Sequence, residues 1–111
     1  MEISYANSRI QKICTDERVA RKELGNDVAK MLYKRLKQMH DVKYLSDLRF
    51  LPGDWHELKG NRKGEIACSV SGRVRLIFVP ANIPRPTNVD GGLDWAQVTA
   101  VVNLEITDYH K

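Results

Sequence analysis

The spacing of the apolar residues changes near the middle of this chain. Up to Met39 they recur at helical intervals that Gly25 interrupts, which predicts two helices, near 12–24 and 27–40. In the second half they alternate as in strands, first in "GEIACSVSGRVRLIFVP" and again in "VTAVVNLEITDYHK". Because helices that precede a run of strands usually cover one face of a sheet, we expect an α+β fold.

Shorter elements complete this prediction. "EISY" at residues 2–5 predicts a short strand, and "KYLSDLRFL" predicts a turn of helix that ends at Pro52-Gly53. The stretch 80–97 has three prolines, two adjacent glycines and no periodicity, so we predict an exposed loop there. A chain of 111 residues suits one core. We expect a single domain over 1–111, with the N-terminal strand and the helices on one face of a mainly antiparallel, twisted sheet.

Ser71-Gly72 lies between the first two strands of the second half and favours a tight hairpin. A two-residue loop would pair Val70 with Arg73 and Cys68 with Arg75. One face would then carry Ala67, Val74, Leu76 and Phe78 toward the core, and the other would carry Cys68, Arg73 and Arg75. The hairpin is therefore expected to present two guanidinium groups away from the core.

The final strand carries apolar residues at alternate positions, which are Val98, Ala100, Val102, Leu104 and Ile106. Strict alternation places Asp108 and His110 on the same side as Ile106. A twist or a bulge near Thr107 would be needed to bring them beside Arg75.

Composition narrows the class of protein. Lysine and arginine outnumber aspartate and glutamate by 18 to 14, and the net charge of +4 favours a polyanionic partner without establishing one. Cys14 and Cys68 form neither a CxxC motif nor a disulfide framework, so we expect reduced thiols. No apolar run approaches the roughly 20 residues of a membrane span, and the N-terminus has no secretion signal. We therefore expect a cytoplasmic protein that does not contact a membrane.

A set of polar side chains in the second half carries the candidate chemistry. Cleavage of RNA needs one group to remove the 2′-OH proton, a second to protonate the leaving 5′ oxygen, and cations beside the transition state. Histidine suits the proton transfers, and lysine or arginine suits the charge. The candidate catalytic residues are His56, Lys59, Arg75, Asp108, Tyr109 and His110, and the candidate RNA-binding residues are Arg62, Lys63 and Arg73. This scheme uses no metal and no other cofactor.

Three motifs follow one another in the second half. They are Leu58-Lys59-Gly60 in "LKGNRKG", the strand residues Arg75 to Phe78, and Asp108-Tyr109-His110. Together they resemble the RelE/ParE toxin superfamily and, within it, the HigB-like "killer protein" branch. The resemblance covers nearly the whole chain and implies a RelE-like fold. The chain departs from the compact members of that family at 80–97, which is longer and richer in proline.

The resemblance implies the toxin of a bacterial type II toxin–antitoxin pair. Such a toxin is a ribosome-dependent endoribonuclease that cuts mRNA in the A site, so its partners are the ribosome, its mRNA and a cognate antitoxin, here of the helix-turn-helix type. Two alternatives keep the same fold. One is a ParE-like inhibitor of gyrase, and the other is a non-catalytic module that binds RNA or a protein.

The endoribonuclease hypothesis gives each candidate residue a role. His56 and His110 would divide the roles of general base and general acid, while Lys59 and Arg75 would stabilise the transition state. Asp108 would orient an imidazole through its carboxylate. Tyr109 would contact a base or a phosphate through its phenol. The order of the two histidines in the reaction stays open at this point.

Overall fold

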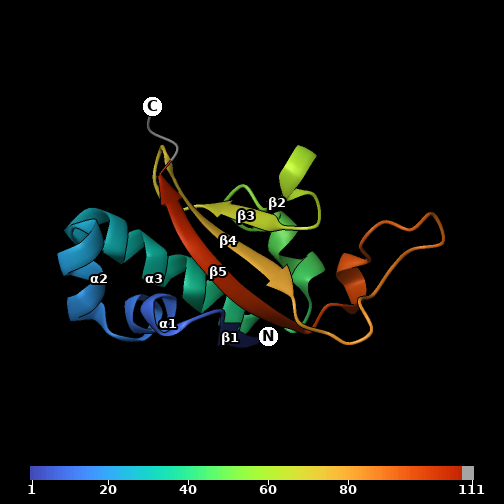
Figure 1. Ribbon diagram of the computed structural model, residues 1–111, viewed down its shortest axis with the longest axis horizontal. Helices are drawn as coiled ribbons and strands as arrows, with labels where there is room; N and C mark the ends of the chain where they lie inside the picture. Colours follow the sequence, from blue (N-terminus) through green and yellow to red (C-terminus); the bar gives the residue numbers. More distant parts are fainter. Residues whose placement is uncertain (109–111) are drawn as a thin grey trace.

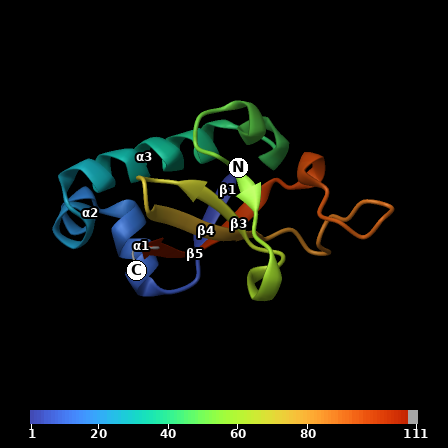
Figure 2. The same cartoon turned by 90° about the horizontal axis from the view of Figure 1, so that it is seen from above.

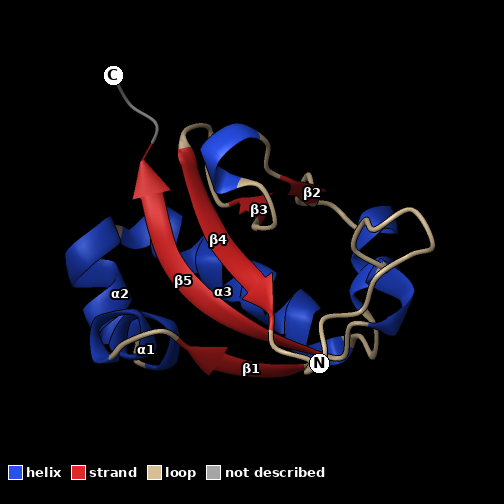
Figure 3. Cartoon of the chain, turned by 45° about the vertical axis from the view of Figure 1, so that its right-hand side comes forward, coloured by secondary structure: helices blue, strands red, loops and turns tan. Residues whose placement is uncertain are grey.

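The computed structural model describes residues 1–108. Its elements in chain order are β1 (Glu2–Tyr5), α1 (Ser8–Thr15), α2 (Glu17–Leu24), α3 (Asn26–Asp41), the 3₁₀ turn η1 (Leu45–Phe50), β2 (His56–Glu57), the 3₁₀ turn η2 (Gly60–Arg62), β3 (Ile66–Ser69), β4 (Val74–Pro80), the 3₁₀ turn η3 (Trp95–Gln97) and β5 (Ala100–Asp108). The strands form one sheet in the order β1-β5-β4-β3-β2 (Figure 1). β1 is parallel to β5 and the other pairs are antiparallel, so the α+β prediction is confirmed (Figure 3).

The helical first part contains three helices where the sequence predicted two. The boundary at Gly25 is confirmed, and this glycine has a φ of 86°. The predicted helix 12–24 is divided at Asp16, whose backbone is extended and whose carboxylate accepts a hydrogen bond from the Arg18 N–H at 3.0 Å. An aspartate that caps a new helix therefore interrupts a stretch whose apolar spacing is continuous.

The main core lies between the helices and one face of the sheet. Figure 2 shows α3 and η1 on one side of the strands and η2 on the other. The fully buried residues of this core include Leu32 and Met39 from α3, and Leu76, Phe78 and Val101 from the sheet. None of the helices formed within residues 1–108 has the length and apolar content of a membrane span.

The β3–β4 hairpin has a register one residue away from the predicted one. Ser69 lies opposite Arg75 and Cys68 opposite Leu76, because the loop contains three residues, 71–73. A shift of one residue turns β3 over relative to β4. Cys68 therefore faces the main core, and Ala67 faces the opposite side together with Arg75, which reverses the prediction for both β3 residues.

The strand β5 contains a bulge, and the alternation of its core-facing residues shifts by one residue there. Ile77 lies opposite Glu105 and Phe78 opposite Asn103, so Leu104 is the extra residue. Before the bulge, Val101 and Asn103 are buried on the core side, whereas Val102 and Leu104 had been predicted there. After it, Ile106 packs against the core as predicted.

The stretch 80–97, which the sequence predicts as an exposed loop, is only partly exposed. Ile83 and Val89 are exposed, but Leu93 and Trp95 are buried in the main core. The side-chain oxygen of Asn82 accepts hydrogen bonds from the backbone N–H groups of residues 99 and 100 at 3.0 and 3.2 Å. The two ends of the loop are thereby tied together at the start of β5.

Candidate active site

His56 lies in β2, and the turn that precedes this strand is held by three hydrogen bonds. The Gly53 carbonyl accepts from the Ser69 N–H of β3 at 2.7 Å. The Pro52 carbonyl accepts from the indole N–H of Trp55 at 3.1 Å and from the Gln38 amide of α3 at 2.9 Å. These bonds connect the turn to β3 and to α3, so they set the position at which β2 begins.

Gly53 is required at its position in this turn. Its φ is 138°, a conformation that residues with a Cβ rarely adopt. A Cβ built there would lie 2.6 Å from Nε1 of Trp55 and 3.1 Å from Nε of Arg35. Arg35 is itself nearly buried and donates from Nε to the Ser69 carbonyl at 2.7 Å. The glycine therefore lets the chain pass close to a buried tryptophan and arginine.

The central feature of the site is the contact between His56 and Arg75. Nε2 of His56 lies 3.5 Å from Nη1 of Arg75. Nδ1 of His56 lies 2.8 Å from the Asp54 carbonyl oxygen, and because a carbonyl only accepts, Nδ1 carries the proton of the neutral ring. Nε2 then holds a lone pair that faces the guanidinium group. A basic nitrogen and a permanent cation are thus placed side by side.

The sheet face that carries this pair lies opposite the main core. Ala67 and Ile77 are buried on it, and Thr107 lies opposite Arg75 on β5. The hydroxyl oxygen of Thr107 is buried and has no hydrogen-bond partner within residues 1–108.

Arg62, predicted to bind RNA, is engaged in two ion pairs. Its Nε donates to Glu65 at 2.7 Å and its Nη2 donates to Glu105 of β5 at 2.7 Å. These carboxylates raise the pKa of Arg62, and Glu105 contributes most. Arg62 therefore holds η2 over the sheet face that carries Arg75. Lys59 and Lys63, on either side of this turn, are exposed.

The remaining predicted residues lie near the C-terminal end of β5. Asp108 lies opposite Val74, one position beyond the Thr107–Arg75 pair. The twist or bulge that was predicted near Thr107 is a bulge at Leu104 instead. Asp108 therefore stays on the same face of β5 as Ile106, opposite the face that carries Arg75. Arg73 is exposed in the hairpin loop. Tyr109 and His110 lie outside the described residues.

A pocket beside His56 contains residues that the sequence did not single out. It has a volume of about 370 Å³, and its lining residues are Arg49, Trp55, His56, Glu57 and Trp95. The Arg49 guanidinium lies 4.0 Å from the centre of the Trp95 ring, and the Trp95 indole N–H donates to Glu57 at 2.7 Å. Apart from His56 itself, the sequence signal for this pocket is a tryptophan in a loop rich in proline and glycine.

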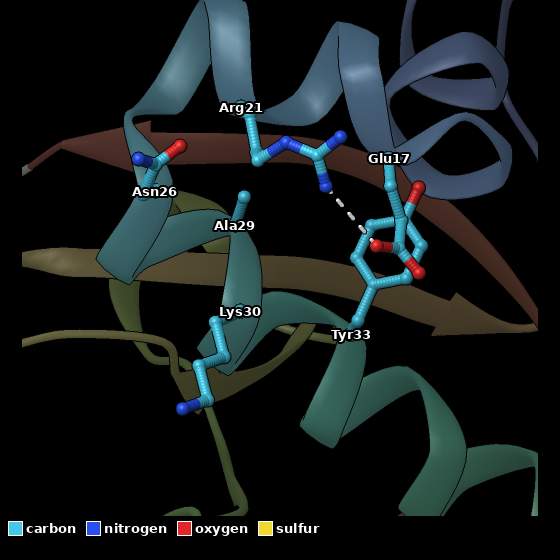
Figure 4. A pocket seen from close by; sticks show the side chains of 6 residues that line it. All are labelled: Glu17, Arg21, Asn26, Ala29, Lys30 and Tyr33. Atoms are coloured by element: carbon cyan, nitrogen blue, oxygen red, sulfur yellow. Dashed lines mark hydrogen bonds and ion pairs between the residues drawn. The ribbon is translucent and has the colours of Figure 1, made fainter.

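Another pocket lies between α2 and α3, away from these residues. Figure 4 shows its lining, in which Arg21 and Glu17 form an ion pair at 3.2 Å. It includes none of the candidate site residues that the structure describes. Across residues 1–108, no group of three or more His, Cys, Asp or Glu side chains is placed to hold a metal ion. Among the described residues, the candidate active site is therefore the one around His56 of β2 and Arg75 of β4.

The fold is similar to that of a YoeB/ParE toxin from Agrobacterium tumefaciens. The TM-score is 0.61 at 7% sequence identity, and the similarity covers 99% of this chain and 100% of that one. No family model and no curated protein matches the sequence. The similarity establishes the RelE/ParE-like fold for this chain.

Proposed function

We propose that this protein is the toxin of a type II toxin–antitoxin pair and belongs to the HigB-like branch of the RelE/ParE superfamily. It cleaves mRNA in the ribosomal A site, in the cytoplasm, by metal-independent acid/base catalysis. The observation that carries the proposal is the contact between His56 Nε2 and Arg75 Nη1 at 3.5 Å on an RelE/ParE-like sheet. The branch assignment rests on the motifs around Lys59, Arg75 and Asp108.

In the proposed reaction, His56 is the general base. Its Nε2 takes the proton of the 2′-OH group as the 2′ oxygen attacks phosphorus and the bond to the 5′ oxygen breaks. Arg75 stabilises the charge that develops on the phosphate oxygens, and the exposed Lys59 adds a second cation. His110 protonates the leaving 5′ oxygen, oriented by Asp108, and Tyr109 contacts a base or a phosphate. The products are a 2′,3′-cyclic phosphate and a 5′-hydroxyl.

The partners follow from this function. The ribosome presents the mRNA, to which the exposed Lys63 and Arg73 and the ion-paired Arg62 contribute positive charge. A cognate antitoxin, of the helix-turn-helix type, neutralises the toxin. A small neighbouring reading frame that encodes such a protein is the expected genetic context.

The test compares two activities of the purified protein. On translating ribosomes, we expect mRNA cut within the A-site codon, with cyclic phosphate ends at the upstream fragment. In a supercoiling assay with DNA gyrase, we expect no inhibition. Inhibited gyrase with intact mRNA would favour the ParE-like alternative, and RNA binding without cleavage would favour a non-catalytic module.

A further inference from the structure

We propose that the pocket formed by Arg49, Glu57 and Trp95 binds one base of the RNA and prefers bases that carry an exocyclic amino group. The inference rests on the proposed function, since it assigns the base to a nucleotide next to the scissile phosphate. The pocket brings together three segments, η1, β2 and η3. Its volume of about 370 Å³ lies at the small end of the range for ligand pockets, about 300–1,000 Å³.

Arg49 supplies a surface on which a base can stack. One side of its guanidinium group covers the Trp95 ring, whose residue is only 4% exposed, while Arg49 itself is exposed. Single-stranded RNA is commonly bound by stacking its bases on aromatic rings or on guanidinium planes. A base on the outer side of Arg49 would extend a stack that already contains the cation and the indole.

A purely structural role accounts for Trp95 and for the side of the Arg49 guanidinium that covers it, but it leaves the N–H groups of Arg49 unused. Trp95 is buried, and its N–H is satisfied by Glu57, so it anchors the loop by itself. Within residues 1–108, the interaction of the Arg49 side chain is its contact with the Trp95 ring, and it makes no hydrogen bond and no ion pair there. Its N–H groups are therefore free to contact a phosphate or a base edge.

Glu57 supplies the preference among bases. One of its carboxylate oxygens accepts from Trp95, and a carboxylate has about four lone-pair sites, so acceptor capacity remains at the pocket. A carboxylate accepts from the amino group of cytosine, adenine or guanine. At the position of the cytosine amino group, uracil has a carbonyl oxygen, which the negative charge of Glu57 repels. Uracil is left with a single N3–H donor between two such oxygens.

The neighbouring His56 connects the pocket to the reaction. It lines the same pocket and contacts Arg75, so one imidazole borders both the proposed base site and the proposed phosphate site. A base held at Arg49 would fix the position of its own ribose and phosphate beside His56. The pocket would then act as a specificity-determining subsite.

The test measures binding in the absence of cleavage. The probes are fluorescein-labelled 2′-O-methyl hexacytidine and hexauridine, which have no 2′-OH for the reaction, and their dissociation constants are measured by fluorescence anisotropy. For the unmodified protein, we expect hexacytidine to bind about tenfold more tightly than hexauridine. A difference of this size is typical of the discrimination that one base contact provides. Glu57→Gln retains an acceptor for Trp95 and should reduce this preference to less than about twofold.

Arg49→Lys separates stacking from charge. It should weaken binding of both hexamers by about tenfold, because a lysine retains the charge but has no planar group to stack on a base. Arg18→Lys, at an exposed position on α2, is the matched control and should bind like the parent. Circular dichroism and thermal unfolding establish that each variant is folded.

The outcomes separate this inference from the proposed function. Equal affinity for the two hexamers, no measurable binding of either, or unchanged affinity in a folded Arg49→Lys variant would overturn the base site. A clear preference for cytosine in a protein that leaves ribosomal mRNA intact would support the base site and reject the endoribonuclease. Cleavage of mRNA without any base preference in the binding assay would support the endoribonuclease and reject the base site.

Discussion

His56 and Arg75 reach one another across an intervening strand. β3 lies between β2 and β4, and the residues that it places opposite them are Ala67 and Ser69. Both are small, so the imidazole and the guanidinium can extend over β3 until Nε2 and Nη1 are 3.5 Å apart. The pair therefore depends on the register of the β3–β4 hairpin and on the start of β2.

The start of β2 depends on Gly53, and Gly53→Ala should destabilise the protein. The new Cβ would lie 2.6 Å from Nε1 of Trp55, at a φ of 138°. Strain of this kind costs roughly 1–3 kcal/mol, which thermal unfolding detects. Gly72→Ala is the control, since a Cβ there has no atom within 4 Å and should change stability little. Equal melting temperatures for the two variants would contradict the role given to Gly53.

The two ion pairs of Arg62 should stabilise the placement of η2 over the sheet. Its side chain is 36% exposed and that of Glu105 is 45% exposed, so solvent screens the interaction. We expect Arg62→Ala to lower the free energy of unfolding by about 0.5–1 kcal/mol, measured by urea denaturation. The loss should shrink in 1 M salt, where the Debye length is about 3 Å. Arg18→Ala, at an exposed arginine of α2, should show neither effect.

The two cysteines should make the protein less stable in alkaline solution. Burial raises the pKa of Cys14 to about 11 and that of Cys68 to about 12, from an ordinary value of 9.0. A raised pKa in the folded state favours the neutral thiol, so this stabilisation is complete below about pH 9 and is lost as the pH rises toward 11–12.

Urea denaturation at several pH values checks this expectation. The parent should lose more of its unfolding free energy between about pH 8 and 11 than a Cys14→Ala/Cys68→Ala variant does. The variant retains part of the loss, because burial also raises the pKa of Tyr33 to about 12. Identical pH dependence in both proteins would show that the thiols do not contribute.

Removal of residues 109–111 should separate folding from activity. β5 ends at Asp108 and pairs with both β1 and β4, so the truncated chain retains the whole described sheet. We expect a cooperative unfolding transition close to that of the parent and loss of mRNA cleavage, because Tyr109 and His110 are missing. Lys111→Ala is the control and should cleave normally. Normal cleavage by the truncated protein would reject the roles proposed for both missing residues.

The sequence predicted the fold better than it predicted the faces of the strands. Apolar spacing located the helices and strands, but Ser71-Gly72 is compatible with a loop of two or of three residues. This difference of one residue in loop length decides whether Ala67 or Cys68 shares a face with Arg75. The bulge at Leu104 had no local signal either, since it follows from the pairing of β5 with β4.

The sequence predicted part of the candidate site. It selected His56 and Arg75 from their chemistry and from a family resemblance, and these two lie together. It also selected Arg62, whose charge is paired with Glu65 and Glu105. It did not predict the contact of Arg49 with Trp95, because these residues come from separate segments that share no periodic pattern and meet only after folding.

The most direct test of the account is a double-mutant cycle at His56 and Arg75, with single-turnover cleavage of mRNA on translating ribosomes as the readout. His56→Ala and Arg75→Ala should each reduce the rate by about 100-fold or more. Because the two side chains act in one transition state, His56 on the 2′-OH proton and Arg75 on the phosphate oxygens, the double variant should be little slower than the slower single variant. Folded single variants that cleave as fast as the parent would contradict the account.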